Sequence, residues 1–208
     1  MPPGPPHDVE GCLMRKLILQ MQMSVDGFVG SDGADGWLLW SWGESNGWDE
    51  DLKRDFNLHF EKIDTILLSR KMAEEGYLSH WSKAAKRYPQ DPFYFFAKRV
   101  TEMAKVVPTN KLTNSVWERT TIQPGGFRRE VTALKTASGG AIGVFGGAGF
   151  AAALISASLV DEFQFYINPT VLGSGVRIFE ASGFQKLKLL EAKGYASGMV
   201  VSRYAPTA

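Results

Sequence analysis

The chain has 208 residues, of which 44% are apolar and 22% are charged, and its formal net charge is +1. This length suits one domain with a real core, and the composition is ordinary for a soluble globular protein. A net charge so close to zero gives no electrostatic reason to expect nucleic acid or an anionic membrane as a partner. The single cysteine, Cys12, excludes an internal disulfide framework and fits a reducing, cytoplasmic location.

The first 13 residues are rich in proline and are predicted to be a disordered leader, so the domain is expected to cover residues 14–205. The leader lacks the charged-then-apolar organisation of a signal peptide. A later stretch, between Lys135 and Asp161, has no charged residue, but it contains six glycines and its most apolar pieces are short. A buried strand followed by a buried helix explains that stretch better than a membrane span.

Hydrophobic periodicity predicts alternating strands and helices along most of the domain. Strands are expected at 14–23, 64–68, 105–108, 115–122, 163–167, 187–189 and 195–204, and a further short strand leads into Gly146. Helices are expected at 48–62, with Ser45 or Asn46 as the cap, and at 70–76, 83–100, 127–136 and 150–157. This order indicates the α/β class, with a central mixed, mostly parallel sheet and flanking helices.

The most informative segment is AIGVFGGAG at 141–149, an apolar run that ends in two adjacent glycines and leads into an alanine-rich helix. Such a junction presents unpaired N–H groups and the positive end of the helix dipole, with no side chain to keep a phosphate away. The spacing is not the GxGxxG of the Rossmann fold, and no acidic residue follows at about 20 residues. By itself the motif leaves open a nucleotide site and a turn that simply allows close packing.

Five segments occur in an order that resembles the dihydrofolate-reductase-like superfamily. They are MSVDGFVG (23–30), DTILLSRKM (64–72), VVPTNKL (106–112), IGVFGGAGF (142–150), and LVDEF (159–163) together with PTVLGSG (169–175). The set most resembles stand-alone relatives of the reductase domain of the bifunctional riboflavin-biosynthesis deaminase–reductase. This resemblance implies a three-layer α/β/α fold with about eight strands, and NADPH lying across the carboxyl ends of the strands.

The resemblance also implies which residues hold NADPH. In relatives the Gly146–Gly147 turn often has a cis peptide, and the N–H groups of residues 147–150 reach the pyrophosphate. Arg70 would grip the adenosine 2′-phosphate, and Lys111 would favour NADPH over NADH. The full implied set is Ser24, Asp26, Gly27, Ser69, Arg70, Lys71, Thr109, Asn110, Lys111, Gly146, Gly147, Ala148, Gly149 and Phe150.

A carboxylate on the first helix binds the pterin in dihydrofolate reductase, and here that helix offers Asp51 and Asp55. Asp55 is the predicted catalytic residue together with Asp26, whereas Trp42, Asp51 and Asp55 are predicted to contact the substrate. If a carboxylate here is buried beside an apolar wall, its pKa is expected to rise. For Asp51 and Asp55 the alternative is a solvated surface acid. The tryptophan-rich loop, with Trp37, Trp40, Trp42 and Trp48, is interpreted either as a lid or as core or dimer contact.

Three positions depart from the family pattern. Ser69 stands where relatives have glycine, Met72 where they have threonine, and Phe145 where pyrimidine reductases have a carboxylate. The chain also lacks the cysteines of a zinc deaminase, and its three histidines show no metal-ligand spacing, so no metal is predicted.

The predicted function is therefore an NADPH-dependent reductase of a pteridine- or pyrimidine-like heterocycle, of the type found in riboflavin biosynthesis. True dihydrofolate reduction and a non-catalytic, dimeric nucleotide-binding module are the alternatives. The resemblance further implies a homodimer. Residues 163–167 and 199–201 are expected to supply either its interface or simply core.

Overall fold

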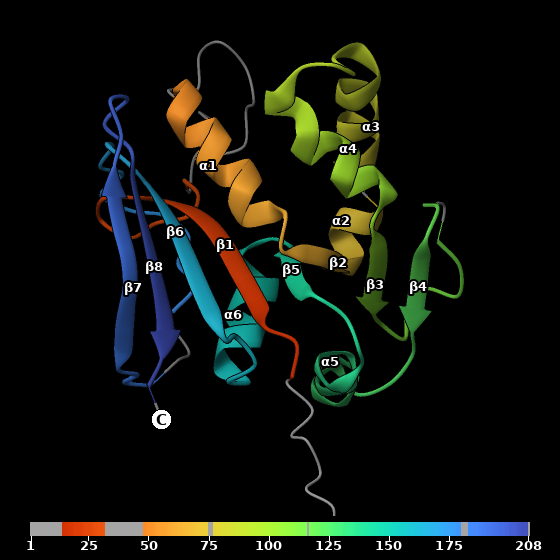
Figure 1. The fold of residues 1–208 in the computed structure, drawn as a ribbon. Helices are drawn as coiled ribbons and strands as arrows, with labels where there is room; N and C mark the ends of the chain where they lie inside the picture. Colours follow the sequence, from red (N-terminus) through yellow and green to blue (C-terminus); the bar gives the residue numbers. More distant parts are fainter. Residues whose placement is uncertain (1–13, 32–47, 75–76, 116, 180–182, 208) are drawn as a thin grey trace, which may run out of the picture.

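The computed structural model describes residues 14–31, 48–74, 77–115, 117–179 and 183–207, and these form a sheet between two layers of helices (Figure 1). The strands are β1 (Leu17–Ser24), β2 (Ile63–Leu68), β3 (Ala104–Pro108), β4 (Thr120–Gln123), β5 (Ala141–Phe145), β6 (Glu162–Asn168), β7 (Leu187–Gly194) and β8 (Val200–Pro206). The helices are α1 (Glu50–Phe60), α2 (Arg70–Glu74), α3 (Tyr77–Arg87), α4 (Phe95–Glu102), α5 (Phe127–Thr136) and α6 (Ala148–Ser156), with a 3-10 turn η1 (Pro92–Tyr94).

The described strands form one eight-stranded sheet in the order β4-β3-β2-β5-β1-β6-β8-β7. The first six strands of that order are mutually parallel, whereas β8 runs antiparallel to β6 and β7 antiparallel to β8. All eight residues of β1 are buried, as expected for a strand covered on both faces. The predicted three-layer α/β/α fold with a mixed, mostly parallel sheet is therefore confirmed. Because six strands are parallel, their carboxyl ends all meet at one edge of the sheet.

The two faces of the sheet have different cores. Helices α1, α3 and α4 cover a face rich in aromatic side chains, where the rings of Phe56 and Phe60 pack edge-on against Phe96 with centroid distances of 5.0 and 4.7 Å. Helices α5 and α6 cover the other face, whose core is largely aliphatic. Phe163 and Val201 are buried in these cores, so most of the segments considered for a dimer interface are core within one chain.

Several boundaries differ from the sequence prediction. The cap of α1 is Asp49, whose carboxylate accepts a hydrogen bond from the Leu52 N–H at 2.9 Å, whereas the predicted caps Ser45 and Asn46 lie outside the described residues. The helix expected at 83–100 is two helices, because α3 ends at Arg87 and the Pro92 turn precedes α4. Strand β4 is shorter than expected. The last strand begins only at Val200, since residues 195–199 form the β7–β8 turn.

The uncharged stretch that raised the question of a membrane span divides into β5 and α6. Within the described ranges, no helix combines the length and the apolar character that crossing a bilayer requires. The predicted leader at 1–13 and the loop at 32–47 lie outside the described residues.

Candidate functional site

Four loops to which the family resemblance assigns NADPH contacts follow β1, β2, β3 and β5 and lie at the shared carboxyl edge of the sheet. The Ser69 N–H donates to the Phe145 carbonyl at 2.9 Å, which joins the exits of β2 and β5. The Thr109 N–H donates to the Gln123 carbonyl at 3.1 Å, which fixes the exit of β3. The fold thus brings residues that are more than a hundred positions apart in the chain to one edge.

The two glycines in the turn after β5 differ in the room that each leaves for a side chain. A Cβ on Gly146 would lie 2.4 Å from Cδ1 of Phe150, whereas a Cβ on Gly147 would have no heavy atom within 4 Å. The peptide between the two glycines is trans, so the cis peptide implied by the family resemblance is not found here. Gly147 is the N-cap of α6 and supplies no side-chain hydrogen bond to it.

The N–H groups of the first turn of α6 lie at the amino-terminal end of the helix, where ordinary helical hydrogen bonding leaves them without a carbonyl partner. The Phe150 N–H donates to the Gly147 carbonyl at 3.0 Å, so its predicted role as a phosphate donor stays a prediction. Ala148 and Gly149 occupy first-turn positions where no helix carbonyl can accept from them. A Cβ on Gly149 would likewise meet open space. The turn therefore offers two backbone donors in a cradle that larger side chains would fill.

The exit of β2 places a cation next to this cradle. The Ser69 hydroxyl accepts a hydrogen bond from the Met72 N–H at 3.2 Å, so the serine that replaces the family glycine caps α2. Arg70 pairs with Glu74 one turn later, and their side chains are 38% and 43% exposed. Such a solvated pair contributes little to stability, and a phosphate can therefore replace the carboxylate at small cost.

The exit of β3 is held by its own hydrogen bonds. The Thr109 hydroxyl accepts from the Lys111 N–H at 3.1 Å, and the Asn110 amide donates to the Gly125 carbonyl at 3.3 Å. The Lys111 side chain is exposed, as is that of Lys71. The edge thus carries several cations beyond the glycine turn, which favours a ligand with more than one phosphate.

Asp26 has a positioning role in the loop after β1. Its carboxylate accepts hydrogen bonds from the Gly173 N–H at 2.7 Å and the Leu172 N–H at 3.2 Å, which tie this loop to the segment after β6. The hydroxyl of Ser24, together with these N–H groups, lowers the pKa of Asp26 to about 2. The carboxylate is therefore charged at neutral pH, and its predicted catalytic role stays a prediction. Gly27 takes a φ of +84°, which the tight turn beside it requires.

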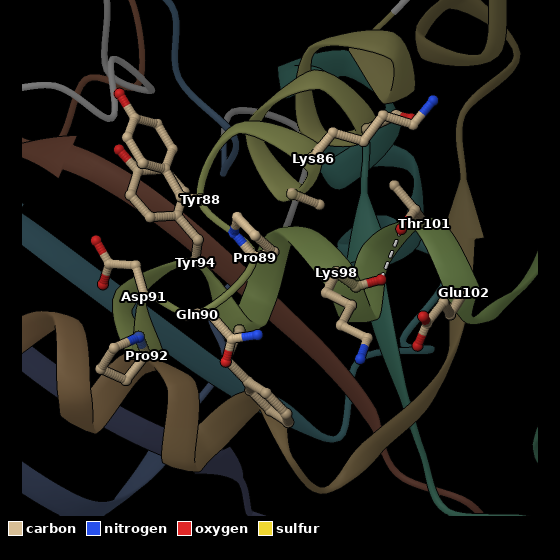
Figure 2. A pocket seen from close by; sticks show the side chains of 13 residues that line it. Lys86, Tyr88, Pro89, Gln90, Asp91, Pro92, Tyr94, Lys98, Thr101 and Glu102 are labelled. Carbon is tan, nitrogen blue, oxygen red and sulfur yellow. Dashed lines mark hydrogen bonds between the residues drawn. The ribbon is translucent and has the colours of Figure 1, made fainter.

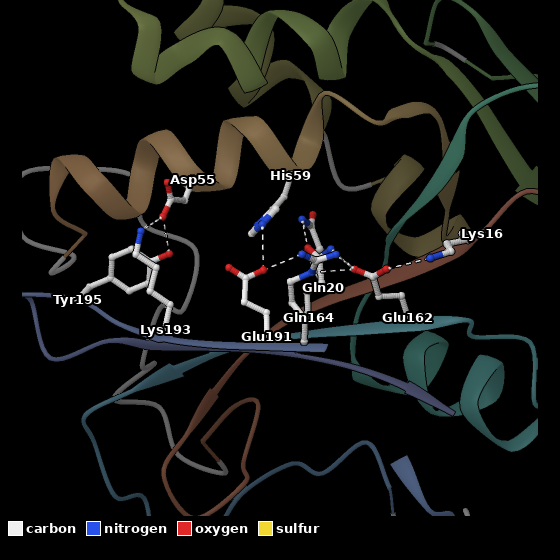
Figure 3. A network of polar contacts seen from close by, with 10 residues as sticks. Lys16, Gln20, Asp55, His59, Glu162, Gln164, Glu191, Lys193 and Tyr195 are labelled. Atoms are coloured by element: carbon white, nitrogen blue, oxygen red, sulfur yellow. Dashed lines mark hydrogen bonds and ion pairs between the residues drawn. The ribbon is translucent and has the colours of Figure 1, made fainter. Parts of the chain in front are cut away.

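Asp55 lies on α1 and is held by the β7–β8 hairpin (Figure 3). Its carboxylate pairs with Lys193 at 2.5 Å and accepts a hydrogen bond from the Tyr195 hydroxyl at 2.9 Å. Partial burial disfavours the charge, but the contacts with Lys193 and Tyr195 outweigh it and hold the pKa of Asp55 below its usual value. The condition for a raised pKa, burial beside an apolar wall, is not met at Asp55, and its predicted catalytic and substrate-binding roles stay predictions.

The other two predicted substrate contacts, Asp51 and Trp42, lie on the surface and outside the described residues, respectively. Asp51 is 66% exposed and pairs with Arg54 at 2.7 Å, so it is the solvated surface acid of the alternative interpretation. Trp48 is buried and stacks on Tyr166 with a centroid distance of 5.4 Å, and it is therefore core rather than lid. Trp42, with Trp37 and Trp40, lies outside the described residues.

A buried polar network lies under α1, and its residues are not among the site residues predicted from the sequence (Figure 3). The amide of Gln20 donates to Gln164 at 2.9 Å, and that of Gln164 donates to Glu162 at 2.8 Å. Arg203 then bridges Glu162 and Glu191, each at 2.7 Å. The available signal was the alternation of polar residues within otherwise apolar strands, at Gln20 on β1 and at Glu162 and Gln164 on β6.

The described residues contain no group of three or more His, Cys, Asp or Glu side chains arranged to hold a metal ion. Six parallel strands with an antiparallel terminal hairpin, covered by helices on both faces, define an α/β protein of the dihydrofolate-reductase-like class. The chain is 13% identical to dihydrofolate reductase from Enterococcus faecalis complexed with NADP(H), with a TM-score of 0.51 over 93% of this chain and 97% of that one.

The family follows from the whole domain. Residues 15–201 match the model of the RibD C-terminal domain, and the chain belongs to this family. It is 29% identical to the uncharacterized protein YyaP of Bacillus subtilis (strain 168) over 189 residues, which are 89% of this chain and 92% of that protein. It is also similar in fold to a putative riboflavin biosynthesis protein from Shewanella sp. PV-4, with a TM-score of 0.63, 16% identity and coverage of 93% and 99%.

Proposed function

We propose that this protein is an NADPH-dependent reductase that transfers hydride to a pteridine- or pyrimidine-like heterocycle. The observation that carries this proposal is the start of α6, where Ala148 and Gly149 offer backbone donors beside the open space at Gly147. A dinucleotide fits there because its pyrophosphate requires N–H donors, a favourable helix dipole and no side chain in the way. When bound, NADPH supplies the hydride, and the protein supplies binding and orientation.

The neighbouring loops would bind the rest of the dinucleotide. Arg70 would exchange Glu74 for the adenosine 2′-phosphate, which a guanidinium can bind through two parallel hydrogen bonds. Lys111 would add a second positive charge and favour NADPH over NADH. The loop at Ser24 and Gly27, fixed by Asp26, would border the nicotinamide at the end of β1 and so orient its reactive carbon toward the substrate.

We further propose that the domain acts in the cytoplasm as a homodimer. Strand β7 is the edge of the sheet, and it exposes Leu189 by 53% and Leu190 by 42%. Val200 on the adjacent strand is 39% exposed. A sheet edge with exposed apolar side chains is a surface that soluble proteins ordinarily cover, and a second copy of the chain would cover it across a two-fold axis.

The proposal is tested by titrating the protein with NADPH and with NADH while following tryptophan fluorescence, and then by adding pterins and pyrimidines and following NADPH oxidation. We expect tighter binding of NADPH than of NADH, and Arg70→Ala should remove that preference. Arg54→Ala deletes an exposed arginine on α1 and is the control for binding alone: it should leave the preference for NADPH over NADH unchanged. Binding without turnover of any heterocycle would favour the non-catalytic nucleotide-binding module, and binding of neither dinucleotide would refute the reductase.

A further inference from the structure

A cavity of about 390 Å³ lies between α3, α4 and the segment that precedes β4. Leu78, Ser82 and Lys86 of α3 line one side of it, and Lys105, Trp117 and Glu118 line the other. Lys105 stands near the amino-terminal end of β3, whose other end leads to the candidate cofactor edge at Thr109. The cavity is thus separate from the site proposed for NADPH, and its volume is in the range of small-molecule pockets.

Lys105 is an unusual residue to find in this wall. It is only 2% exposed, and its ammonium donates to the carbonyls of Thr101 at 3.0 Å and Met103 at 2.9 Å. An ammonium has three donors, so one remains after these two bonds. Among the described residues, no carboxylate lies within ion-pair distance of it. Burial, with a smaller contribution from the charge of Arg119, lowers the pKa of Lys105 to about 8, although Glu118 acts in the opposite direction.

A second buried lysine in the same chain shows what is missing. Lys135 is 6% exposed, and its ammonium bonds to the Leu159 carbonyl at 3.0 Å and pairs with Asp161 at 2.7 Å. Buried charges are ordinarily paired in this way, because an unpaired charge away from water is costly. Lys105 has the carbonyl contacts of Lys135 but lacks a bonded carboxylate, so an anion in the cavity would supply the missing partner.

The rest of the cavity wall suits a flat apolar body. Leu78 is buried, and the ring of Trp117 is fixed because its indole N–H donates to the Ala73 carbonyl at 2.6 Å. Glu118 also faces the cavity and would repel a doubly charged phosphate more strongly than a single carboxylate. One remaining ammonium donor likewise matches a group with a single negative charge.

We propose that this cavity binds a small aromatic carboxylate, whose carboxylate pairs with Lys105 and whose ring packs between Trp117 and Leu78. The proposal does not depend on the reductase function, since the cavity and the carboxyl edge share no residue. An adjoining cavity of about 600 Å³, where the rings of Tyr88 and Tyr94 stack at 4.3 Å, shares Ser82, Lys86 and Thr101 with the first but has no buried lysine (Figure 2). Its charged side chains, Lys98 among them, are not buried, and it therefore provides the control.

The test is isothermal titration calorimetry of the full chain with benzoate, and with benzamide as the uncharged analogue. We expect one saturable benzoate site. Benzamide should bind at least about tenfold more weakly than benzoate, because the charge-assisted hydrogen bond is lost. Because only the ammonium pairs with the anion, benzoate binding should weaken about tenfold between pH 7 and pH 9. At pH 8 the heat should depend on the ionisation enthalpy of the buffer, since binding takes up a proton.

Three variants separate this role from a structural one. Lys105→Met should abolish benzoate binding, whereas Lys98→Met in the neighbouring cavity should leave it unchanged. Because Lys105→Met also removes hydrogen bonds at the end of α4, Ser82→Glu provides an independent check. It keeps the lysine but adds a carboxylate to the same cavity, and it should weaken benzoate binding about tenfold or more. Benzamide binding as tightly as benzoate, no saturable benzoate site, or full binding by a folded Lys105→Met or Ser82→Glu protein would each overturn the proposal.

Discussion

Gly147→Ser is expected to stabilise the fold and to weaken NADPH binding, two effects of opposite sign from one hydroxyl group. Gly147 has φ −70° and ψ 174°, which a serine adopts without strain, and a Cβ there meets no atom within 4 Å. A serine at this N-cap can accept a hydrogen bond from the first turn of α6, which glycine leaves uncapped. The same hydroxyl would stand where we propose that the pyrophosphate binds.

The size of each effect follows from the geometry. Serine is better than glycine at an N-cap by a few tenths of a kcal/mol, and the loss of chain freedom in the unfolded state adds about 0.4–1 kcal/mol. A gain of roughly 0.5–1.5 kcal/mol would raise the Tm of a chain of this size by about 1–6 °C. Loss of one charge-assisted hydrogen bond to phosphate, about 1.5–3 kcal/mol, would raise the Kd for NADPH by roughly 10- to 150-fold.

The assay pairs thermal unfolding with fluorescence titration of NADPH. Gly126→Ser is the matched control, because Gly126 is also an uncapped helix N-terminus, at α5, with no atom within 4 Å of a Cβ. It follows β4, which two strands separate from β5. We expect Gly126→Ser to raise the Tm and leave the Kd unchanged. A Gly147→Ser protein that gains stability but binds NADPH normally would refute the placement of the pyrophosphate at α6.

Three further predictions concern stability and assembly. Asp55→Asn should lower the free energy of unfolding, measured by urea denaturation at pH 7, by roughly 1–2 kcal/mol. Because the folded pKa of Asp55 is lowered, this difference between the two proteins should shrink as the pH falls below 3.8. A difference that does not change with pH would contradict the pairing with Lys193. Between pH 8 and 10.5 the unfolded chain holds a proton that folded Lys105 has released, so the unfolding free energy should rise with pH, and the slope should be lower in Lys105→Met. Leu190→Lys should convert the proposed dimer to a monomer in sedimentation equilibrium, and a persistent dimer would exclude the β7 edge.

The sequence predicts an element correctly where residues close together in the chain determine it. The helix expected at 127–136 has those bounds in the structure, because its apolar spacing and the following Ser138–Gly140 stop are encoded within a dozen residues. The turn after β5 was likewise readable from its two glycines. The cap of α1 was not, since Ser45, Asn46 and Asp49 are all good capping residues and local sequence does not choose among them.

Features that depend on contacts between residues far apart in the chain could not be predicted from the sequence. Asp55 was correctly placed on α1, but its partners Lys193 and Tyr195 lie 138 and 140 positions away. These two contacts hold the carboxylate in its charged form and tie a helix to a hairpin, and local sequence does not indicate either partner. Arg70 shows the reverse case, because its partner Glu74 is one helical turn away and the pair follows from spacing alone.

The position before the glycine pair bears most directly on the substrate. The family resemblance implies a carboxylate at this position in pyrimidine reductases, where this chain has Phe145. The Phe145 side chain is 7% exposed and stacks on Phe96 with a centroid distance of 6.0 Å. The side chain is therefore part of the aromatic core under α1 and offers nothing polar to a pyrimidine. Because specificity resides in such groups rather than in the fold, family membership does not carry the riboflavin intermediate with it. We expect the turnover screen to give a higher kcat/KM for a pteridine than for a ribosylaminopyrimidine, and the opposite order would show that another group replaces the missing carboxylate.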